Sequence, residues 1–196
     1  MYSIYTFLLS FLLSWTMLFF SISILRKKLV VKPNNRSSHY LPKPTGGGIS
    51  FVFVTTFICL FFRNYIPLIA LPLSYLGLID DRINVPSKFR FIAQILSIIL
   101  LLFLITNTHE LSFLKNNIQD YYSIFSISII ILIGVSLINF VNFMDGIDGL
   151  VSGCMIIVFL ILSISLDNSL WSLVGSLLGF IFWNWSPSKV FMGDIG

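Results

Sequence analysis

The sequence predicts an all-α, polytopic membrane helical bundle with about seven transmembrane helices and an N-terminus outside the cell. Of the 196 residues, 57% are hydrophobic and only 10% are charged, whereas soluble domains carry about 25% charged residues. The mean hydropathy is +0.95. Long uncharged runs such as residues 121–138 also indicate spanning helices. The chain, 1–196, is expected to form a single membrane domain.

Three apolar runs are long enough, or nearly so, for spanning helices, which need about 20 residues. They cover 3–25, 91–106 and 121–143. The first run ends in Arg26-Lys27-Lys28 and lacks both a basic start and a small-residue cleavage site. We therefore interpret it as an anchor and not as a cleaved signal peptide.

Two longer apolar regions are each interrupted by one polar pair, Arg63-Asn64 or Asp167-Asn168. As one straight helix, each region would measure about 51 Å. A bilayer core of about 30 Å, crossed at a tilt of about 40°, accommodates only about 39 Å. We expect both regions to fold back at the polar pair, which gives helices over 46–62, 65–79, 150–166 and 169–183.

The basic residues lie almost entirely on one side of these spans. Only Arg63 and Lys115 fall on the other side, so the positive-inside rule makes the basic side cytoplasmic. Topology thus accounts for the formal net charge of +4, and no nucleic acid is expected as a partner. Cys59 and Cys154 lie inside apolar runs and are expected to be core thiols.

This orientation gathers five aspartates at the cytoplasmic ends of the spans. Carboxylates in one place repel one another unless a cation or a proton intervenes, so the pattern indicates a divalent-metal site. Five separate, solvated acids are the alternative. The five residues are Asp80, Asp81, Asp145, Asp148 and Asp194.

The aspartate pair at Asp80 and Asp81 precedes two basic residues, Lys88 and Arg90. Adjacent carboxylates can hold Mg²⁺, or one can accept a proton from a phosphate nucleophile. Lysine and arginine donors suit phosphate oxygens. A solvated loop with topogenic basic residues is the alternative.

A second polar stretch has Asn139, Asn142 and Asp145 at every third position. On a helix these residues share a face about 120° wide, and Gly146 then lets the backbone turn. Such a stripe is unfavourable in lipid, so it should face the bundle interior or a wet cavity. An inter-helix hydrogen-bond patch is the alternative.

Two further stretches are weaker signals when taken alone. The loop over 36–50 is basic and rich in proline and glycine, and glycines 46–48 could present N–H groups to an anion. A tight linker is the alternative, and His39 alone would be a surface histidine. Asp194 follows the last span in a short glycine-flanked segment.

Together and in this order, the four stretches resemble the polyprenyl-phosphate N-acetylhexosamine-1-phosphate transferases of glycosyltransferase family 4, over 36–196. The resemblance implies transfer of a HexNAc-1-phosphate from a UDP-sugar to polyprenyl (undecaprenyl) phosphate with release of UMP. This reaction initiates lipid-linked cell-surface glycans such as lipopolysaccharide O antigen. Mg²⁺ is the implied cofactor, which Mn²⁺ could replace. The implied partners are UDP-HexNAc, polyprenyl phosphate and membrane lipid, with a homodimer possible. The implied site is on the cytoplasmic face of the inner (plasma) membrane.

The resemblance also assigns roles, position by position. It makes Asn142 and Asp194 the metal ligands. It makes Asp80, Asp81, Asp145 and Asp148 catalytic. One of the first pair is the base, and the second pair borders the nucleotide and catalytic pocket. The residues implied for substrate binding are Arg90, Lys88, Asn139, Gly146, Arg36 and His39.

Two features depart from the family pattern. Relatives often read P-T-P-R-G-G-G where this chain has Pro42-Lys43-Pro44-Thr45-Gly46, so Lys43 is the candidate replacement for the missing arginine. Relatives are also longer and carry more spans. We therefore expect this chain to be the N-terminal part of a longer protein that continues beyond the C-terminus.

Rival interpretations come from other classes. A cation transporter or channel with a cytoplasmic acidic mouth would need acids near mid-membrane, whereas the span centres here carry no charge. An inactive truncated fragment with a structural role is a second alternative. A CDP-alcohol phosphotransferase is disfavoured because its D-G-x2-A-R motif is absent.

Overall fold

The computed structural model describes residues 2–31, 41–107, 121–165 and 170–196. The described residues form seven α-helices, which confirms the all-α prediction. Two two-residue strands pair antiparallel, with Val31 opposite Lys43. In chain order the elements are α1 (Tyr2–Lys28), β1 (Val30–Val31), β2 (Lys43–Pro44), α2 (Ile49–Phe61), the 3-10 helix η1 (Ile66–Ile69), α3 (Ala70–Ile83), α4 (Ser87–Asn107), α6 (Tyr121–Met144), α7 (Leu150–Ser165) and α8 (Trp171–Asn184).

Three of these helices, α1, α4 and α6, are long and apolar enough to cross a membrane. Helices α2, α7 and α8 are apolar but shorter. At about 1.5 Å per residue, a helix of about 14 residues reaches about 21 Å, less than the bilayer core. Three helices that could span a membrane are therefore present where the sequence predicts long apolar runs.

Both long apolar regions break into two helices, as the length argument predicted. Helix α2 ends at Phe61, and the chain reverses through Arg63, which has a left-handed φ of 59°. Helix α7 ends at Ser165 and α8 begins at Trp171, while the Asp167-Asn168 pair itself lies outside the described residues.

Several helix boundaries differ from the sequence prediction, and two of these differences matter for the site. Helix α3 continues to Ile83, so Asp80 and Asp81 stand on its last turn and not after it. Helix α4 begins at Ser87, which puts Arg90 on its first turn and not in a loop. Charged residues at helix ends extend an apolar helix beyond the membrane, and hydropathy alone does not register them.

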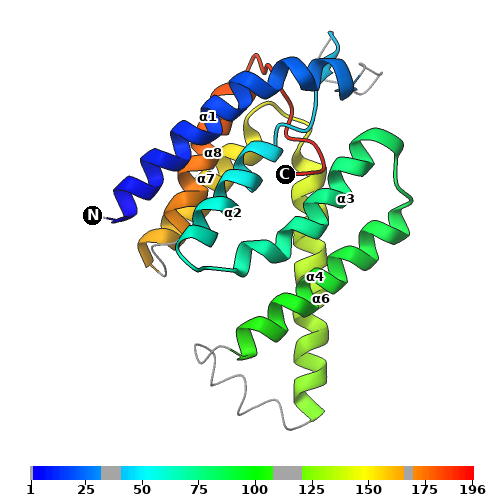
Figure 1. The fold of residues 1–196 in the computed structure, drawn as a ribbon. Helices are drawn as coiled ribbons and strands as arrows, with labels where there is room; N and C mark the ends of the chain where they lie inside the picture. Colours follow the sequence, from blue (N-terminus) through cyan, green and yellow to red (C-terminus); the bar gives the residue numbers. More distant parts are fainter. Residues whose placement is uncertain (1, 32–40, 108–120, 166–169) are drawn as a thin grey trace.

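The body of the molecule forms around α8, which packs against α1, α2 and α7. Figure 1 shows α1 lying along α8, while α4 and α6 project away from this body as an arm. The core of the body is made of Leu18, Phe51, Leu177, Phe180 and Val190. Because Val190 follows α8, the C-terminal residues belong to the core.

Helices α1 and α8 approach closely because α8 has glycines on the shared face. A Cβ atom at Gly175 would lie 2.2 Å from the Ser10 hydroxyl, and one at Gly179 would lie 2.5 Å from the Phe11 carbonyl oxygen. Any larger residue would push the helices apart.

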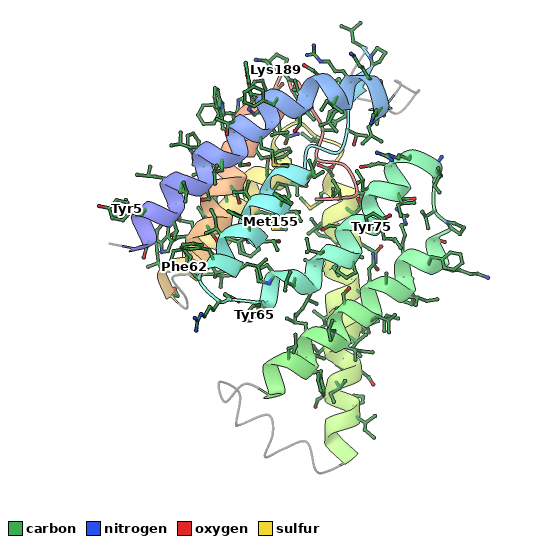
Figure 2. The ribbon with its side chains drawn as sticks, viewed as in Figure 1. Tyr5, Phe62, Tyr65, Tyr75, Met155 and Lys189 are labelled. Atoms are coloured by element: carbon green, nitrogen blue, oxygen red, sulfur yellow. The ribbon has the colours of Figure 1, made fainter. Side chains whose placement is uncertain are left out.

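The two helices of the arm, α4 and α6, pack against each other over a small interface, and most of the surface of both helices is exposed. Ile98 and Val135 are the buried hydrophobic residues between them. On the connecting η1–α3 segment, Tyr65 and Tyr75 are also exposed (Figure 2). Such apolar exposure suits lipid-facing helices.

Candidate functional site

Residues 185–196, which we call the C-terminal segment, cross the ends of α3, α6 and α2. At Gly77 on α3, a Cβ atom would lie 2.0 Å from the Asp194 carbonyl oxygen. The absence of a side chain at Gly77 therefore lets the segment lie directly on α3. Asp80 and Asp81, one helical turn further along, stand beside it.

Arg90 joins two of the predicted acids. Its Nη1 donates to Asp80 Oδ2 and, at 2.8 Å, to Asp194 Oδ2. The Val85 backbone N–H donates to the other oxygen of Asp80. The Asp80 side chain is 8% exposed, that of Asp194 29% and that of Arg90 34%. Arg90 thus supplies the positive charge that lets two acids share this site.

Asp81 contacts the same segment from the other side. The Asp194 backbone N–H donates to Asp81 Oδ1 at 3.3 Å. Asp81 Oδ2 is buried and has no hydrogen-bond partner among the described residues. This oxygen and the Thr45 hydroxyl both face Gly193, where a Cβ atom would lie 2.4 Å and 2.6 Å from them.

The glycine run 46–48 packs against the C-terminal segment. The N–H groups of Gly47 and Gly48 donate to the carbonyl oxygens of Phe191 and Met192, each at 2.9 Å. The Phe191 N–H donates back to Pro44 O at 2.8 Å. The idea that these N–H groups bind an anion is therefore wrong for Gly47 and Gly48, because backbone oxygens already occupy them.

Asp145 approaches the cluster from the end of α6. Burial raises the pKa of Asp145 to about 7, although a hydrogen bond from the Gly193 backbone opposes the rise; the charge of Asp81 adds to it. Burial also raises the pKa of Asp194 to about 7, and the neighbouring carboxylates of Asp80 and Asp81 act in the same direction, while Arg90 opposes them. Both carboxyl groups therefore resist losing their proton, because burial and the neighbouring carboxylates disfavour a further negative charge at this place.

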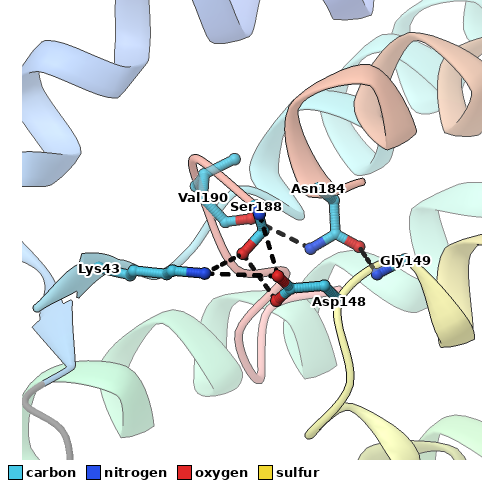
Figure 3. Close-up of polar contacts among 6 residues, drawn as sticks. All are labelled: Lys43, Asp148, Gly149, Asn184, Ser188 and Val190. Carbon is cyan, nitrogen blue, oxygen red and sulfur yellow. Dashed lines mark hydrogen bonds and ion pairs between the residues drawn. The ribbon is translucent and has the colours of Figure 1, made fainter. Parts of the chain in front are cut away.

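Asp148 belongs to a separate ion pair (Figure 3). Lys43 Nζ lies 3.4 Å from Asp148 Oδ2 and donates to Ser188 Oγ at 2.9 Å. Ser188 donates to Asp148 through its backbone N–H at 3.0 Å and its hydroxyl at 2.7 Å. Burial acts to raise the pKa of Asp148, but the Ser188 hydrogen bonds and the Lys43 charge outweigh it, so the net direction is downward.

Asn184, which the sequence analysis missed, fixes the loop that carries Asp148. It is 3% exposed. Its Oδ1 accepts from the Gly149 N–H at 3.1 Å, and its Nδ2 donates to Val190 O at 3.0 Å (Figure 3). The same Oδ1 also accepts from the Ser152 hydroxyl at 3.0 Å. A lone amide at the end of an apolar helix was the available signal, because buried amides need partners.

The asparagines of the predicted polar stripe have different surroundings. Asn139 Nδ2 donates to Gln94 Oε1 at 2.8 Å and Gln94 Nε2 donates back at 3.4 Å, so this amide pair joins α6 to α4. Asn142 is exposed. The inter-helix hydrogen-bond alternative therefore describes Asn139, and its role toward substrate stays a prediction.

The remaining predicted residues are Lys88, Gly146, Arg36 and His39. Lys88 is exposed on the first turn of α4. A Cβ atom at Gly146 would meet nothing within 4 Å, so this backbone has open space beside it. Arg36 and His39 lie outside the described residues.

The carboxylate oxygens of the acidic cluster suit Mg²⁺, which prefers oxygen ligands. Asp81 Oδ2, buried without a hydrogen-bond partner in the described chain, is the kind of atom that a cation would satisfy. Across the described ranges, no three His, Cys, Asp or Glu side chains converge on one point that could hold a metal ion. Arg90 bridges two of the candidate carboxylates.

The model of glycosyl transferase family 4 matches residues 64–196, which include every element of the acidic cluster. The chain belongs to glycosyl transferase family 4. The family resemblance drawn from the motifs is therefore confirmed.

Individual relatives agree with this family membership. A phospho-N-acetylmuramoyl-pentapeptide-transferase of Prochlorococcus marinus (strain NATL2A) is 29% identical over 97% of this chain and 61% of its own length. Enzymes with the same name from Staphylococcus carnosus (strain TM300) and Staphylococcus haemolyticus (strain JCSC1435) are 32% and 34% identical, over 78% of this chain and 57% of their own lengths. The chain thus spans about three fifths of the curated relatives that it matches.

Proposed function

We propose that the protein transfers a HexNAc-1-phosphate from a UDP-sugar to a polyprenyl phosphate and releases UMP. The observation that carries this proposal is the cluster of Asp80, Asp81, Asp194 and Arg90, built within the family-matched region. The names of the relatives support the same reaction class, a phospho-sugar transfer.

The acids and Arg90 have complementary tasks in this reaction. The lipid phosphate oxygen attacks the β-phosphorus of the UDP-sugar, so catalysis consists mainly of positioning and of neutralising charge. Asp80 or Asp81 orients or deprotonates the lipid phosphate. Arg90 has a planar guanidinium with several donors for phosphate oxygens, and exposed Lys88 lies two residues before it on the first turn of α4.

Asn142 and Asp194 would hold the Mg²⁺ ion. A bound Mg²⁺ would neutralise negative charge on the diphosphate and on the UMP leaving group. Asp145 and Asp148 keep neighbouring loops in place, the first against Gly193 and the second against Ser188.

We also propose a seven-helix topology in the plasma membrane, with the cluster on the cytoplasmic face. The ends of α1, α3, α6 and α8 and the starts of α2, α4 and α7 gather at the end of the molecule that carries the cluster (Figure 1). Arg26, Lys27 and Lys28 form the last turn of α1 at this end, which agrees with the positive-inside rule.

Product formation tests the proposal. Membranes containing the chain should convert undecaprenyl phosphate and labelled UDP-sugar into a Mg²⁺-dependent lipid-linked product. UDP-GlcNAc and UDP-MurNAc-pentapeptide form two parallel arms. The loop over 36–50 resembles that of the UDP-GlcNAc-using members of the family, and the names of the relatives point to the second substrate. Asp194→Asn should reduce turnover by about 100-fold or more if the carboxylate holds the metal.

Controls separate a failed assay from a failed proposal. Arg82→Gln, which changes an exposed residue on the last turn of α3, should retain activity. UMP binding by the chain in detergent distinguishes an inactive fragment of a UDP-sugar transferase from a family member that does not use a UDP-sugar. A chain that binds no UMP and forms no product, or an Asp194→Asn variant with full activity, would contradict the assignment.

A further inference from the structure

One guanidinium nitrogen is shared by two carboxylates that come from distant parts of the chain. Arg90 Nη1 donates both to Asp80 on α3 and to Asp194 in the C-terminal segment. Asp81 stands beside them through its bond with the Asp194 backbone. A position between carboxylate oxygens of separate segments is also where a divalent cation binds in proteins. Because the proposed function makes Asp194 a metal ligand, Arg90 and the metal would compete for the Asp194 carboxylate.

We propose that Arg90 is an internal counter-cation that holds Asp194 against Asp80 in the metal-free protein and must release Asp194 when a divalent cation binds. This inference rests on the proposed function, because it takes Asp194 as a metal ligand.

The geometry allows this release without unfolding the site. Asp80 stays fixed by the Val85 N–H, and the backbone at Asp194 stays fixed by Asp81. The Arg90 side chain is 34% exposed, so it can turn toward solvent from the first turn of α4. Only the contact between Arg90 and the Asp194 carboxylate has to break.

The competition has a consequence with a definite sign. Removing Arg90 removes the competing cation, so the substrate-free protein should bind a divalent metal more tightly. A purely structural Arg90 predicts the opposite result, because loss of the bridge would disorder Asp194 and weaken binding. The released guanidinium would then be available to phosphate oxygens.

Mn²⁺ binding distinguishes these outcomes. Free Mn²⁺ is followed by electron paramagnetic resonance during titration of the purified full chain in nanodiscs, without nucleotide. Arg90→Gln should bind Mn²⁺ at least about tenfold more tightly than the wild type, because a nearby positive charge is lost. Arg82→Gln is the matched control, with the same charge change at an exposed residue two positions after Asp80. Equal tightening in both variants, or no tightening in Arg90→Gln, would overturn the proposal.

A second measurement needs no substitution at Arg90. Phenylglyoxal modifies accessible arginines, and peptide mass spectrometry reports the rate at Arg90 with Arg82 as internal reference. Saturating Mg²⁺ should increase the Arg90 rate severalfold, and Asp194→Asn should abolish that response. An unchanged or slower rate in a chain that binds Mn²⁺ and forms product would overturn this inference alone. A wild-type chain that binds no Mn²⁺ would contradict the metal assignment in the proposed function as well.

Discussion

At the scale of single residues, Asp145 links burial to a measurable pH dependence. Burial raises its pKa from 3.8 to about 7 in the folded protein. Between these values the folded state keeps a proton that the unfolded state has released, so stability falls as the pH rises through this window. We expect the unfolding temperature of the metal-free protein to drop between about pH 4 and pH 7, and to drop less in Asp145→Asn. Thermal unfolding in detergent with EDTA measures both profiles.

Some pH dependence should survive in this variant, because the pKa of Asp194 is raised in the same direction. The comparison therefore concerns the slope of the two profiles. An Asp145→Asn profile as steep as that of the wild type would show that this carboxyl is not protonated in the fold.

Asn184 should matter more for stability than any exposed polar residue. Asn184→Ala would leave the Gly149 N–H, the Ser152 hydroxyl and the Val190 carbonyl without this partner. A buried unsatisfied group costs about 1–3 kcal/mol, so we expect a loss of about 2–3 kcal/mol in equilibrium unfolding in mixed micelles.

The matched control for Asn184→Ala is Ser136→Ala. Ser136 is exposed. Among the residues that the structure describes, its hydroxyl donates within its own helix, to Leu132 O. Its replacement should change stability by less than about 0.5 kcal/mol. Equal stability of the two variants would mean that the Asn184 contacts do not hold the loop.

Residue types at span ends allowed the sequence to predict the acidic cluster, but not its pairing. Asp80, Asp194 and Arg90 could be named because charges next to apolar helices are conspicuous. Their shared hydrogen bonds depend on Gly77, which lets two distant segments touch. The Lys43 pair with Asp148 likewise joins residues far apart in the chain. No local pattern encodes such contacts.

At the scale of elements, packing between α1 and α8 depends on a glycine that local propensity disfavours. A Cβ atom at Gly175 would lie 2.2 Å from Ser10 Oγ and 2.3 Å from Phe7 O. Gly175→Ala should therefore destabilise the protein by about 1–3 kcal/mol through overpacking. Unfolding in mixed micelles measures the loss.

Gly153 in α7 provides the same substitution in an open place. A Cβ atom there would meet only Ile181 Cδ1, at 3.7 Å. Gly153→Ala should be neutral or stabilising by up to about 1 kcal/mol, because alanine restricts the unfolded chain. If Gly175→Ala caused no loss of stability either, helices α1 and α8 could not be packed as closely as the structure shows.

The breaks in the two long apolar regions could be predicted from bilayer thickness, which does not constrain the short strands β1 and β2 or the glycine run 46–48. A bilayer limits helix length, so a long apolar region with one polar pair must turn. The strands β1 and β2 and the pairing of 46–48 with the C-terminal segment have no such constraint. They form because tertiary packing brings backbone groups together, which explains why the glycine run was open to a different interpretation.

At the scale of the whole molecule, a compact body carries an arm, α4 and α6, that other parts of the described chain cover only to a small extent. The arm helices α4 and α6 are long enough to span a membrane, and most of their large apolar side chains are exposed. Lipid can cover these surfaces, because hydrocarbon tails are as apolar as leucine. The site forms where the arm meets the body, so α4 contributes Arg90 while the body contributes the C-terminal segment.

This arrangement predicts that the loop after α3 and the loop after α6 face the same compartment. In a chain with Cys59→Ala and Cys154→Ser, single cysteines at Ser87 and Ile147 should react with a membrane-impermeant maleimide only from the cytoplasmic side. Both native residues at these positions are exposed. A cysteine at Tyr65, in the turn between α2 and α3, should react only from outside. Because Asp81 and Asp145 must meet across these loops, labelling of Ser87→Cys and Ile147→Cys from opposite sides would contradict the cluster and the transferase proposal together.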